Sequence, residues 1–414
     1  MTSEQGQFSD DIADDFGDEF DPGAVVALTS ALVRLRTVHD HEAAQVETRA
    51  ADLLADTMRG FGWNVTVTEV SPGRPNVVAE VHGARPGRTL MFEGHLDVVT
   101  EADPDLWSFD PYSGEVVDGR LRGRGSADMK SGVAAMVHAA RAVELGGFDG
   151  RIILGALADE EGMMLGAKYF ARDVRAGLWG VIDGVIVCEP EGGEVCPVAK
   201  GAIRLQVDLV GVMAHGAMPQ MGRNPVPAVG SLLVGLDQIQ QAIRAQTGTH
   251  PLLGEFSLTP TVLQAGSPDQ INVIPATATL ALDIRTVPGV DHLMLIELII
   301  RLADTLAAES GLHARVTVID DRPPVDTPVD SPVVQAMFAG HHVATGRPAV
   351  LGGVPGTTDG TILTRDAGLP TVVYGPGGKW IAHQADEYVE VADIVISTRA
   401  YIAAARHFLG DPHQ

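Results

Sequence analysis

Three apolar segments of the chain each run straight into an acidic residue or a histidine, and this recurrence constrains the fold more than any other feature. Residues 88–92 lead into EGHLD at 93–97, residues 152–158 lead into DEE at 159–161, and residues 185–188 lead into Glu189. Segments this rich in valine, isoleucine and leucine are typical of central strands in an α/β sheet, and such sheets bind ligands beyond the carboxyl ends of their strands. Because three junctions would deliver His and Glu side chains to one edge, we expect a hydrolytic metal centre there.

The size, charge and cysteine content of the chain exclude several classes of protein. Its 414 residues exceed one ordinary core, so we expect two domains. The net charge of −25 argues against nucleic acid or an anionic membrane as a partner, since both are bound mainly through basic surfaces. No apolar run reaches the ~18 residues of a membrane helix, and the acidic N-terminus predicts no signal peptide. Cys188 and Cys196 fit neither a zinc knuckle nor a disulfide framework, which favours a reducing cytoplasm.

The first part of the chain alternates between helical and extended patterns. Residues 1–22 are rich in acidic side chains, and we expect a solvated, poorly ordered tail there. Asp21 and Pro22 are typical of the start of a helix, which we expect to run to about residue 36. Further helices are predicted at 42–59 and 129–144, and strands at 63–70 and 76–81. The alternation indicates an α/β domain with a mostly parallel sheet.

The middle of the chain follows a different pattern. Between residues 201 and 320 we expect, in order, strand 203–210, helix 226–245, strand 256–263, strand 273–285, helix 291–308 and strand 314–319. This βαββαβ order predicts a small two-layer α+β domain, inserted into the α/β domain and suited to dimerisation or to acting as a lid. The metal-binding catalytic domain would then comprise residues 23–200 and 321–414, with a last strand at 371–374 and a closing helix at 393–409.

His95 and Asp97 are the first pair of candidate site residues. They are two positions apart in an extended segment, so both side chains point to one face. A metal-binding imidazole commonly donates from its second nitrogen to a carboxylate, which fixes the tautomer and the direction of the ring. Asp97 is well placed for that task. A His-Asp surface pair in a loop is the alternative.

Asp128 lies in the segment GRGSADMKSG at residues 123–132, where the long helix is expected to begin. It is either a simple N-cap or a carboxylate that bridges two cations with one oxygen on each. A nucleotide-binding loop is disfavoured, because the segment lacks the third glycine of a dinucleotide fingerprint and the spacing of a Walker lysine.

Glu160, Glu161 and His383 extend the candidate metal centre. Adjacent residues of an extended segment point in opposite directions, so one glutamate can bind metal while the other faces substrate. At the start of a helix, the pair would merely favour the helix dipole. His383 follows the last apolar strand and a glycine-rich loop, and is a candidate for the last ligand. Two imidazoles with three or four carboxylates suit Zn²⁺, Mn²⁺ or Co²⁺ and argue against a thiolate or haem site.

These motifs, in this order, resemble the co-catalytic zinc metallohydrolases that include acetylornithine deacetylase, succinyl-diaminopimelate desuccinylase, aminoacylase and carboxypeptidase G. The resemblance extends from about residue 25 to residue 407. It rests on GHLDVV at 94–99, GRGSADMKSG at 123–132, ADEEG at 158–162, CEP at 188–190, AHG at 214–216 and HQADEYV at 383–389.

The resemblance implies a role for each candidate residue. One metal would be held by His95, Asp128 and Glu189, and a second by Asp128, Glu161 and His383. Asp97 would orient His95, and Glu160 would be the general base. The cofactor would be one or two divalent transition-metal ions per subunit.

Three residues of the insertion domain also match motifs of the family. Relatives place a histidine of this domain into the active site of the partner subunit, and His215 occupies that motif, which predicts a homodimer. Without the resemblance, His215 would be taken as a turn residue. Asn272 and Arg285 match positions that bind a substrate carboxylate in relatives, although a structural salt bridge with Asp283 is an alternative for Arg285. Relatives often carry serine where this chain has Gly216, and the loss of this hydroxyl suggests a substrate other than the commonest acyl amino acids.

We therefore expect a metal-dependent hydrolase of a carbon–nitrogen bond, most simply the amide of a small carboxylate-bearing molecule. Metal binding lowers the pKa of water, and Glu160 takes the proton and later returns it to the leaving nitrogen. The nearest alternative is a hydrolytic deaminase or amidohydrolase acting on a non-peptide acid, aromatic acids included. A metal-binding scaffold without turnover is disfavoured, because it would have no use for a free base at Glu160. A dinucleotide-dependent oxidoreductase is disfavoured by the missing third glycine.

Overall fold

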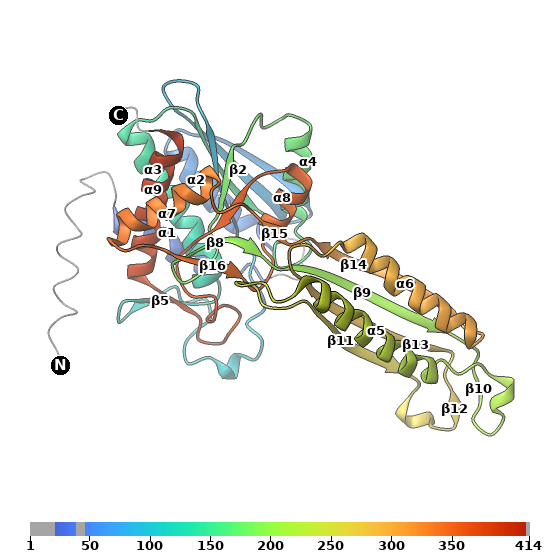
Figure 1. The fold of residues 1–414 in the computed structure, drawn as a ribbon. Helices are drawn as coiled ribbons and strands as arrows, with labels where there is room; N and C mark the ends of the chain where they lie inside the picture. Colours follow the sequence, from blue (N-terminus) through green and yellow to red (C-terminus); the bar gives the residue numbers. More distant parts are fainter. Residues whose placement is uncertain (1–20, 39–45, 411–414) are drawn as a thin grey trace, which may run out of the picture. The chain divides into compact units, whose positions relative to one another are not determined.

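The computed structural model describes residues 21–38 and 46–410 (Figure 1). The chain divides into two compact units. The larger unit comprises the residues up to Pro197, Thr327–Gly353 and the residues from Thr358 onward, and the smaller unit comprises Val198–Asp326 and Val354–Thr357. The acidic tail predicted at residues 1–22 lies almost wholly outside the described residues. Within the described residues, no helix is both long and apolar enough to cross a membrane.

A mixed sheet forms the centre of the larger unit. Its main strands are, in spatial order, β1 (Asn64–Ser71), β2 (Arg74–His82), β6 (Arg151–Leu157), β3 (Thr89–His95), β7 (Gly184–Val187), β17 (Thr371–Val373) and β8 (Glu194–Ala199). The short strands β15 (Val325–Asp326) and β16 (Val350–Val354) both pair with β8. The inner strands β6, β3, β7 and β17 are parallel, whereas β1, β2 and β8 pair antiparallel. The expected mostly parallel sheet is therefore found only at the centre. A tight hairpin joins β1 to β2, and a hairpin forces antiparallel pairing.

The register of the inner strands sets the level of the residues that follow them. Glu93 on β3 pairs with Val187, the last residue of β7, and His95 pairs with Leu157, the last residue of β6. Counting two residues onward, Glu189 follows β7 at the level of His95. By the same count, Asp159 follows β6 at the level of Asp97. The carboxyl ends of three parallel strands thus open at one edge of the sheet, as the apolar segments predict.

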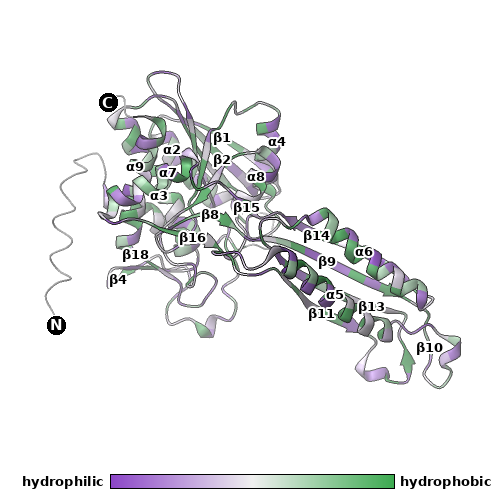
Figure 2. Cartoon of the chain, viewed as in Figure 1, coloured by the Kyte–Doolittle hydropathy of each residue, from purple (hydrophilic) through white to green (hydrophobic). Residues whose placement is uncertain are grey.

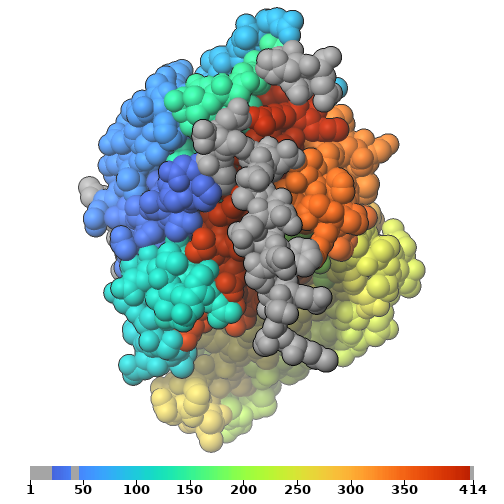
Figure 3. Space-filling model, turned by 90° about the vertical axis from the view of Figure 1, so that its left-hand side faces the viewer, coloured from blue at the N-terminus to red at the C-terminus, as the bar shows by residue number. Residues whose placement is uncertain are grey.

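Helices cover both faces of this sheet. One shared hydrophobic core includes the sheet and the helices α1 (Pro22–Val33), α2 (Thr48–Gly60), α3 (Ser131–Gly146), α7 (Pro332–Thr345) and α9 (Val391–Leu409). The helices α4 (Leu165–Arg175) and α8 (Gly360–Ala367) pack against each other on the opposite side (Figure 1). Helices α1 and α9, from the two ends of the described chain, lie side by side (Figure 3).

Two predicted helix starts need correction. Helix α2 begins at Thr48, because Glu47 is buried against Arg74 and its backbone N–H donates to the carbonyl of Gly73. The expected start at residue 42 falls among residues 39–45, which lie outside the described residues. Helix α3 begins at Ser131 rather than at Met129, because the irregular turn Ser126–Lys130 precedes it. Asp128 therefore belongs to a distorted turn and is not an N-cap.

The smaller unit is a four-stranded antiparallel sheet covered by two helices. The strand order is β11 (Ser257–Ala265), β13 (Thr277–Thr286), β9 (Gly201–Val210) and β14 (His313–Arg322). Alternate residues of β13 are buried, as expected for a sheet with one covered face. The helices α5 (Val226–Thr247) and α6 (His292–Glu309) provide that cover, and their apolar and polar residues alternate accordingly (Figure 2).

One predicted strand of the smaller unit is two strands. Residues 273–285 were expected to be continuous, but Pro275 follows the short strand β12 (Val273–Ile274), and β13 begins only at Thr277. Proline has no N–H to donate to a ladder, which explains the interruption. Strand β12 pairs instead with β10 (Ala214–His215).

Candidate metal centre

His95 is the last residue of β3, and its ring is fixed by its own chain. The side chain is 1% exposed, and Nδ1 lies 2.9 Å from the backbone carbonyl of Asp97. A carbonyl can only accept, so Nδ1 carries a proton, and Nε2 is the nitrogen that faces the carboxylates of the site. Nε2 lies 3.3 Å from an oxygen of Asp128 and 3.3 Å from an oxygen of Glu189. Nε2 is buried, yet neither contact has the geometry of a hydrogen bond.

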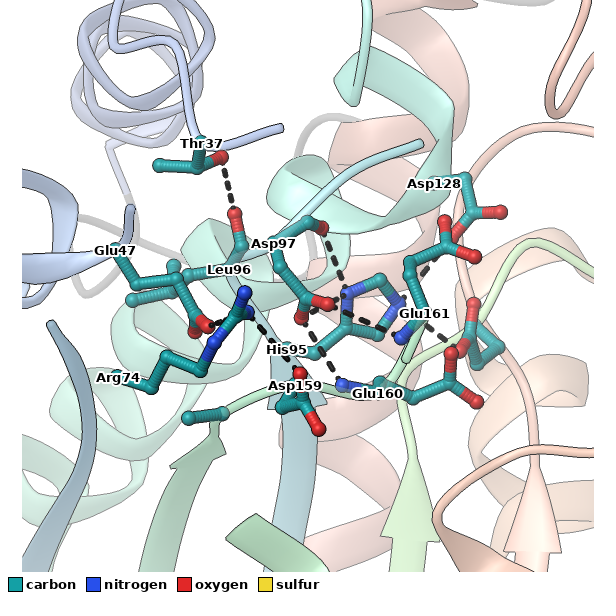
Figure 4. A network of polar contacts seen from close by, with 12 residues as sticks. Thr37, Glu47, Arg74, His95, Leu96, Asp97, Asp128, Asp159, Glu160 and Glu161 are labelled. Carbon is teal, nitrogen blue, oxygen red and sulfur yellow. Dashed lines mark hydrogen bonds and ion pairs between the residues drawn. The ribbon is translucent and has the colours of Figure 1, made fainter. Parts of the chain in front are cut away.

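Asp97 supports the site in two ways. Its carbonyl accepts the hydrogen bond from His95, while its carboxylate lies 3.4 Å from the same ring nitrogen. The carboxylate also accepts from the backbone N–H of Glu160 at 3.2 Å and of Glu161 at 3.1 Å. One residue thus links the end of β3 to the turn that follows β6, and holds both glutamates against His95 (Figure 4).

Glu160 and Glu161 diverge because they lie in a turn, not in the extended segment that the sequence suggested. Asp159 before them has a left-handed backbone with φ of 69°. An oxygen of Glu161 lies 3.0 Å from Nε2 of His383. Glu160 gathers instead with His95 and Glu189, where the three potential ligand atoms lie within 4.8 Å of one another. The two carboxylates therefore reach different parts of the site.

Asp128 lies between the two imidazoles. Its Oδ1 is 3.3 Å from Nε2 of His95, and its Oδ2 is 3.2 Å from Nε2 of His383. One oxygen thus faces each ring, which is the arrangement of a carboxylate shared by two cations. A second group of potential ligands, with atoms within 4.8 Å, comprises His95, Asp128 and Glu161.

A buried carboxylate that sequence reasoning missed holds the turn around Asp128. Glu387 accepts from the backbone N–H of Ala127 at 3.0 Å and of Asp128 at 3.1 Å. Its other oxygen pairs with Arg124 at 2.5 Å, and both side chains are almost fully buried. Glu387 lies inside the HQADEYV segment, but only its place beside Arg124, 263 residues away in sequence, reveals its role.

Two glycines allow the strand ends and loops to approach closely. A Cβ added to Gly132, in the first turn of α3, would lie 2.1 Å from the carbonyl oxygen of Cys188. A Cβ added to Gly375, just after β17, would lie 2.3 Å from the same oxygen. Only glycine fits at such distances. The turn of Asp128 and the loop of His383 can therefore both lie against the segment that carries Glu189.

The electrostatics of the cluster show a shortage of positive charge. Burial raises the pKa of Glu160 well above its usual range; His95 opposes this effect, and Glu161 and Glu189 reinforce it. Burial, reinforced by Asp128, raises the pKa of Glu189 to about 8. Hydrogen bonds to Asp128 and Glu161 raise the pKa of His383 to about 11. Four carboxylates thus share two imidazoles in a buried space, which is costly unless further cations offset them.

The residues fit a pair of divalent ions. The buried Nε2 of His95 has no hydrogen-bond partner, and the carboxylates around it would otherwise repel one another. Imidazole and carboxylate donors together suit Zn²⁺, Mn²⁺ or Co²⁺. His95 lies in one group with Glu160 and Glu189 and in a second group with Asp128 and Glu161, and His383 lies beside Asp128 and Glu161.

A buried arginine network supports the turn of the two glutamates from behind. Arg74 lies 3.3 Å from Glu47 and 3.1 Å from Asp159 (Figure 4). Asp159 in turn accepts from the backbone N–H of Met163 at 3.0 Å. Thr37 adds a hydrogen bond of 2.6 Å to the carbonyl of Leu96, between His95 and Asp97. These residues fix the backbone from which the potential ligands project.

The three candidate residues of the smaller unit do not form one group. His215 and Asn272 are neighbours, because β10 pairs with β12 and the N–H of Gly216 donates to the carbonyl of Asn272 at 2.6 Å. Arg285 lies at the far end of β13 and is held by Asp283 at 2.7 Å. At the usual rise per residue, β13 separates its two ends by about 25 Å. Asn272 and Arg285 of one chain therefore cannot grip the same small carboxylate.

The chain matches the model of peptidase family M20/M25/M40 over residues 91–407. It belongs to this family. The family consists of metal-dependent hydrolases, so the protein is a hydrolase of carbon–nitrogen bonds. This assignment agrees with the resemblance drawn from the sequence motifs.

Individual relatives cover nearly the whole chain. A succinyl-diaminopimelate desuccinylase of Cereibacter sphaeroides is 32% identical over 381 residues, covering 89% of this chain and 94% of the relative. Among solved structures, aminopeptidase PepT of Bacillus cereus has a TM-score of 0.75 at 19% identity, covering 95% of this chain and all of the other. A dinuclear metal binding peptidase of the M20 family from Bacillus subtilis has a TM-score of 0.68 at 16% identity, covering 94% and 99%.

Proposed function

We propose that this M20 hydrolase cleaves the amide bond of a small N-acyl amino acid that carries a carboxylate, using two divalent ions. The position of Asp128, with one oxygen on each imidazole, is the observation that carries the proposal. His95 and Glu189 would complete one ion site with Asp128, and Glu161 and His383 would complete the other. When bound, the ions supply Lewis acidity, which lowers the pKa of water towards about 7 and polarises the scissile carbonyl.

Glu160 would move the proton. Its backbone is fixed by Asp97, and its carboxylate gathers with His95 and Glu189. Burial raises its pKa, and a general base is most effective when its pKa is close to the working pH. Glu160 would take a proton from the attacking water and return it to the nitrogen of the leaving amine. Asp97 and the Arg74 network would keep the carboxylate at the required distance.

The separation of Arg285 from His215 supports a homodimer. A small substrate cannot span the ~25 Å that β13 places between them in one chain. If Arg285 of one subunit and His215 and Asn272 of the other meet at one site, both sets can contact a single substrate. Arg285 would bind the substrate carboxylate, for which a bidentate guanidinium is well suited. His215 would stabilise the developing oxyanion.

The C–N bond of a non-peptide, aromatic acid is the second candidate. It is favoured by the apolar surroundings of His215, where Met218, Met221 and Ile271 are 49%, 68% and 92% exposed. Side chains of this kind would contact an aromatic or long apolar group more readily than a succinyl group. The desuccinylase relatives favour the acyl amino acid instead.

A metal and substrate survey tests the proposal. The purified protein is analysed for metal, stripped with a chelator, and assayed with Zn²⁺, Mn²⁺ or Co²⁺ against N-succinyl, N-acetyl and N-aroyl amino acids and against acidic aromatic amides. We expect activity to vanish on stripping and to return with metal. Full activity in metal-free protein would refute metal dependence. If only the aromatic amides are hydrolysed, the substrate is a non-peptide, aromatic acid and not an N-acyl amino acid.

A further inference from the structure

The loop that carries His383 is tied to the loop that carries Glu189. The backbone N–H of Gly192 donates to the carbonyl of Gly377 at 2.8 Å. Beside this bond, the ammonium of Lys379 lies 2.8 Å from a carboxylate oxygen of Glu191 and 2.9 Å from one of Glu194. It also lies 3.4 Å from the carbonyl of Gly353. Lys379 thus connects its own loop with two other segments of the larger unit.

The surroundings of Lys379 resemble a cation site. Potential ligand atoms of Glu191, Glu194 and Cys196 lie within 4.8 Å of one another. Glu191 is 4% exposed, and a carboxylate buried to this degree requires a compensating cation. The ammonium of Lys379 supplies that charge from within the chain. The group is therefore a built-in ion pair between two loops.

The two imidazoles of the metal centre differ in how firmly they are held. His95 is 1% exposed, ends a strand that is paired on both sides, and is fixed by Asp97. His383 is 53% exposed and lies in a loop, in a left-handed conformation with φ of 65°. Lys379 lies four residues before His383, and the buried Glu387 lies four residues after it. The loop around His383 is thus attached on both sides, and the bond from the N–H of Ser108 to Asp386 at 2.7 Å adds to the downstream attachment.

We propose that Lys379 is a positioning residue that sets the affinity of the ion site formed by His383 and Glu161. This inference rests on the proposed metal-dependent function. Residues that orient metal ligands without touching the metal typically contribute 10- to 100-fold to affinity. Loss of the ammonium would free the loop upstream of His383 and leave Glu191 buried without its cation. The other ion site, built on His95, would keep its geometry.

Titration of Zn²⁺ into stripped protein tests the inference directly. The wild type is expected to bind two ions. In Lys379→Met, which keeps an unbranched apolar stem, we expect one ion to bind roughly 10- to 100-fold more weakly and the other to keep its affinity. Lys379→Arg, which keeps the charge, should recover part of the loss. Lys168→Met, a control that removes a lysine from helix α4 of the same unit, should titrate like the wild type.

A double-mutant cycle identifies which ion is affected. His383→Ala should weaken the same ion as Lys379→Met, and adding Lys379→Met to His383→Ala should change the remaining ion very little. Glu194→Gln, at a partly exposed position, should weaken binding of the same ion by a smaller factor, and this variant serves if Lys379→Met does not fold. Circular dichroism confirms folding of each variant.

Two results would overturn the inference. One is wild-type affinity for both ions in Lys379→Met, and the other is an equal loss at both ion sites. A wild type that binds no ion would instead refute the proposed function itself, so the two failures are distinguishable.

Discussion

The candidate site residues of the larger unit lie close together, whereas the three candidate residues of the smaller unit lie near opposite ends of the long strand β13. In the larger unit, parallel strands end at one edge, so residues that follow β3, β6, β7 and β17 meet although they are far apart in sequence. In the smaller unit, β13 runs antiparallel to its neighbours, and Asn272 and Arg285 lie beyond and near its opposite ends. The parallel strands of the larger unit thus place the residues that follow them at one edge of the sheet, whereas the antiparallel strand β13 separates the residues at its two ends.

The largest effect is expected where the larger unit is most concentrated. Glu160→Gln should lower kcat by about 10²–10⁴-fold, because the proposed general base is lost while the proposed metal ligands remain. Steady-state kinetics and metal analysis of the same preparation check this. Glu297→Gln, an exposed residue of α6 paired only at the surface with Arg301, provides a matched control that should leave kcat unchanged. If Glu160→Gln instead loses metal but reaches a normal rate in excess metal, Glu160 is the metal ligand and Glu161 is the general base.

The proposed homodimer, in which the two ends of β13 from different subunits meet, predicts complementation between inactive subunits. Glu160→Gln and His215→Ala should each be nearly inactive alone. In a mixed dimer, the His215→Ala chain contributes an intact Glu160 and its partner contributes an intact His215 to one of the two sites. Random pairing should therefore restore about a quarter of wild-type activity, and purified mixed dimers about half, by counting sites in a two-fold dimer. Differently tagged chains show whether the subunits exchange. If they exchange and the mixture stays inactive, His215 acts in the site of its own subunit or does not take part in catalysis.

The two ends of β13 should also differ in their kinetic effects. Arg285→Met should raise KM by roughly 10- to 100-fold with a smaller change in kcat, because a charged hydrogen bond to the substrate contributes about 1.5–3 kcal/mol. His215→Ala should act mainly on kcat, because its contact strengthens in the transition state. A substrate series with and without the carboxylate provides the control. If Arg285→Met affects both kinds of substrate equally, the pair with Asp283 is structural.

The last prediction concerns the free energy of unfolding rather than turnover, and no change in the catalytic rate is used to test it. Glu387→Gln keeps an acceptor for the N–H groups of Ala127 and Asp128 but leaves Arg124 buried without its anion. Breaking one partner of a buried pair costs about 3–5 kcal/mol. The matched control is Glu390→Gln on the same segment, because Glu390 pairs with Arg120 at the surface and should contribute at most ~1 kcal/mol. Urea denaturation of the metal-free proteins measures the free energy of unfolding of both variants. Similar losses of stability in the two variants would show that the buried ion pair is not the cause.

The sequence predicted the larger unit's cluster because the signal there is local. Each long apolar run ends in a charged residue, and the edge of a parallel sheet brings such ends together. The sequence did not predict the supports of the cluster. Arg124 and Glu387 are 263 residues apart, and no local pattern distinguishes a buried glutamate from a solvated one. The same limit applies to Arg74 and Glu47, and to Lys379 and Glu191.

The errors of prediction have a common physical origin. The start of α2, the distorted turn at Asp128 and the interruption at Pro275 all lie where contacts from distant parts of the chain, or a missing N–H, override local propensity. The mostly parallel sheet was overestimated because the hairpin between β1 and β2 was taken as part of the alternating pattern. Element types were therefore predicted better than their ends and directions.

The register of β3 has a consequence for how the protein matures. Because neighbouring residues of a strand face opposite sides, a slip of β3 by one position would turn the ring of His95 away from Asp128 and Glu189. Such a misfolded chain would keep the secondary structure of the native one but lose its ion site. Ions that bind only the correctly aligned chain would therefore stabilise the native register over the slipped one, and the same residues would serve both the alignment of the sheet and catalysis.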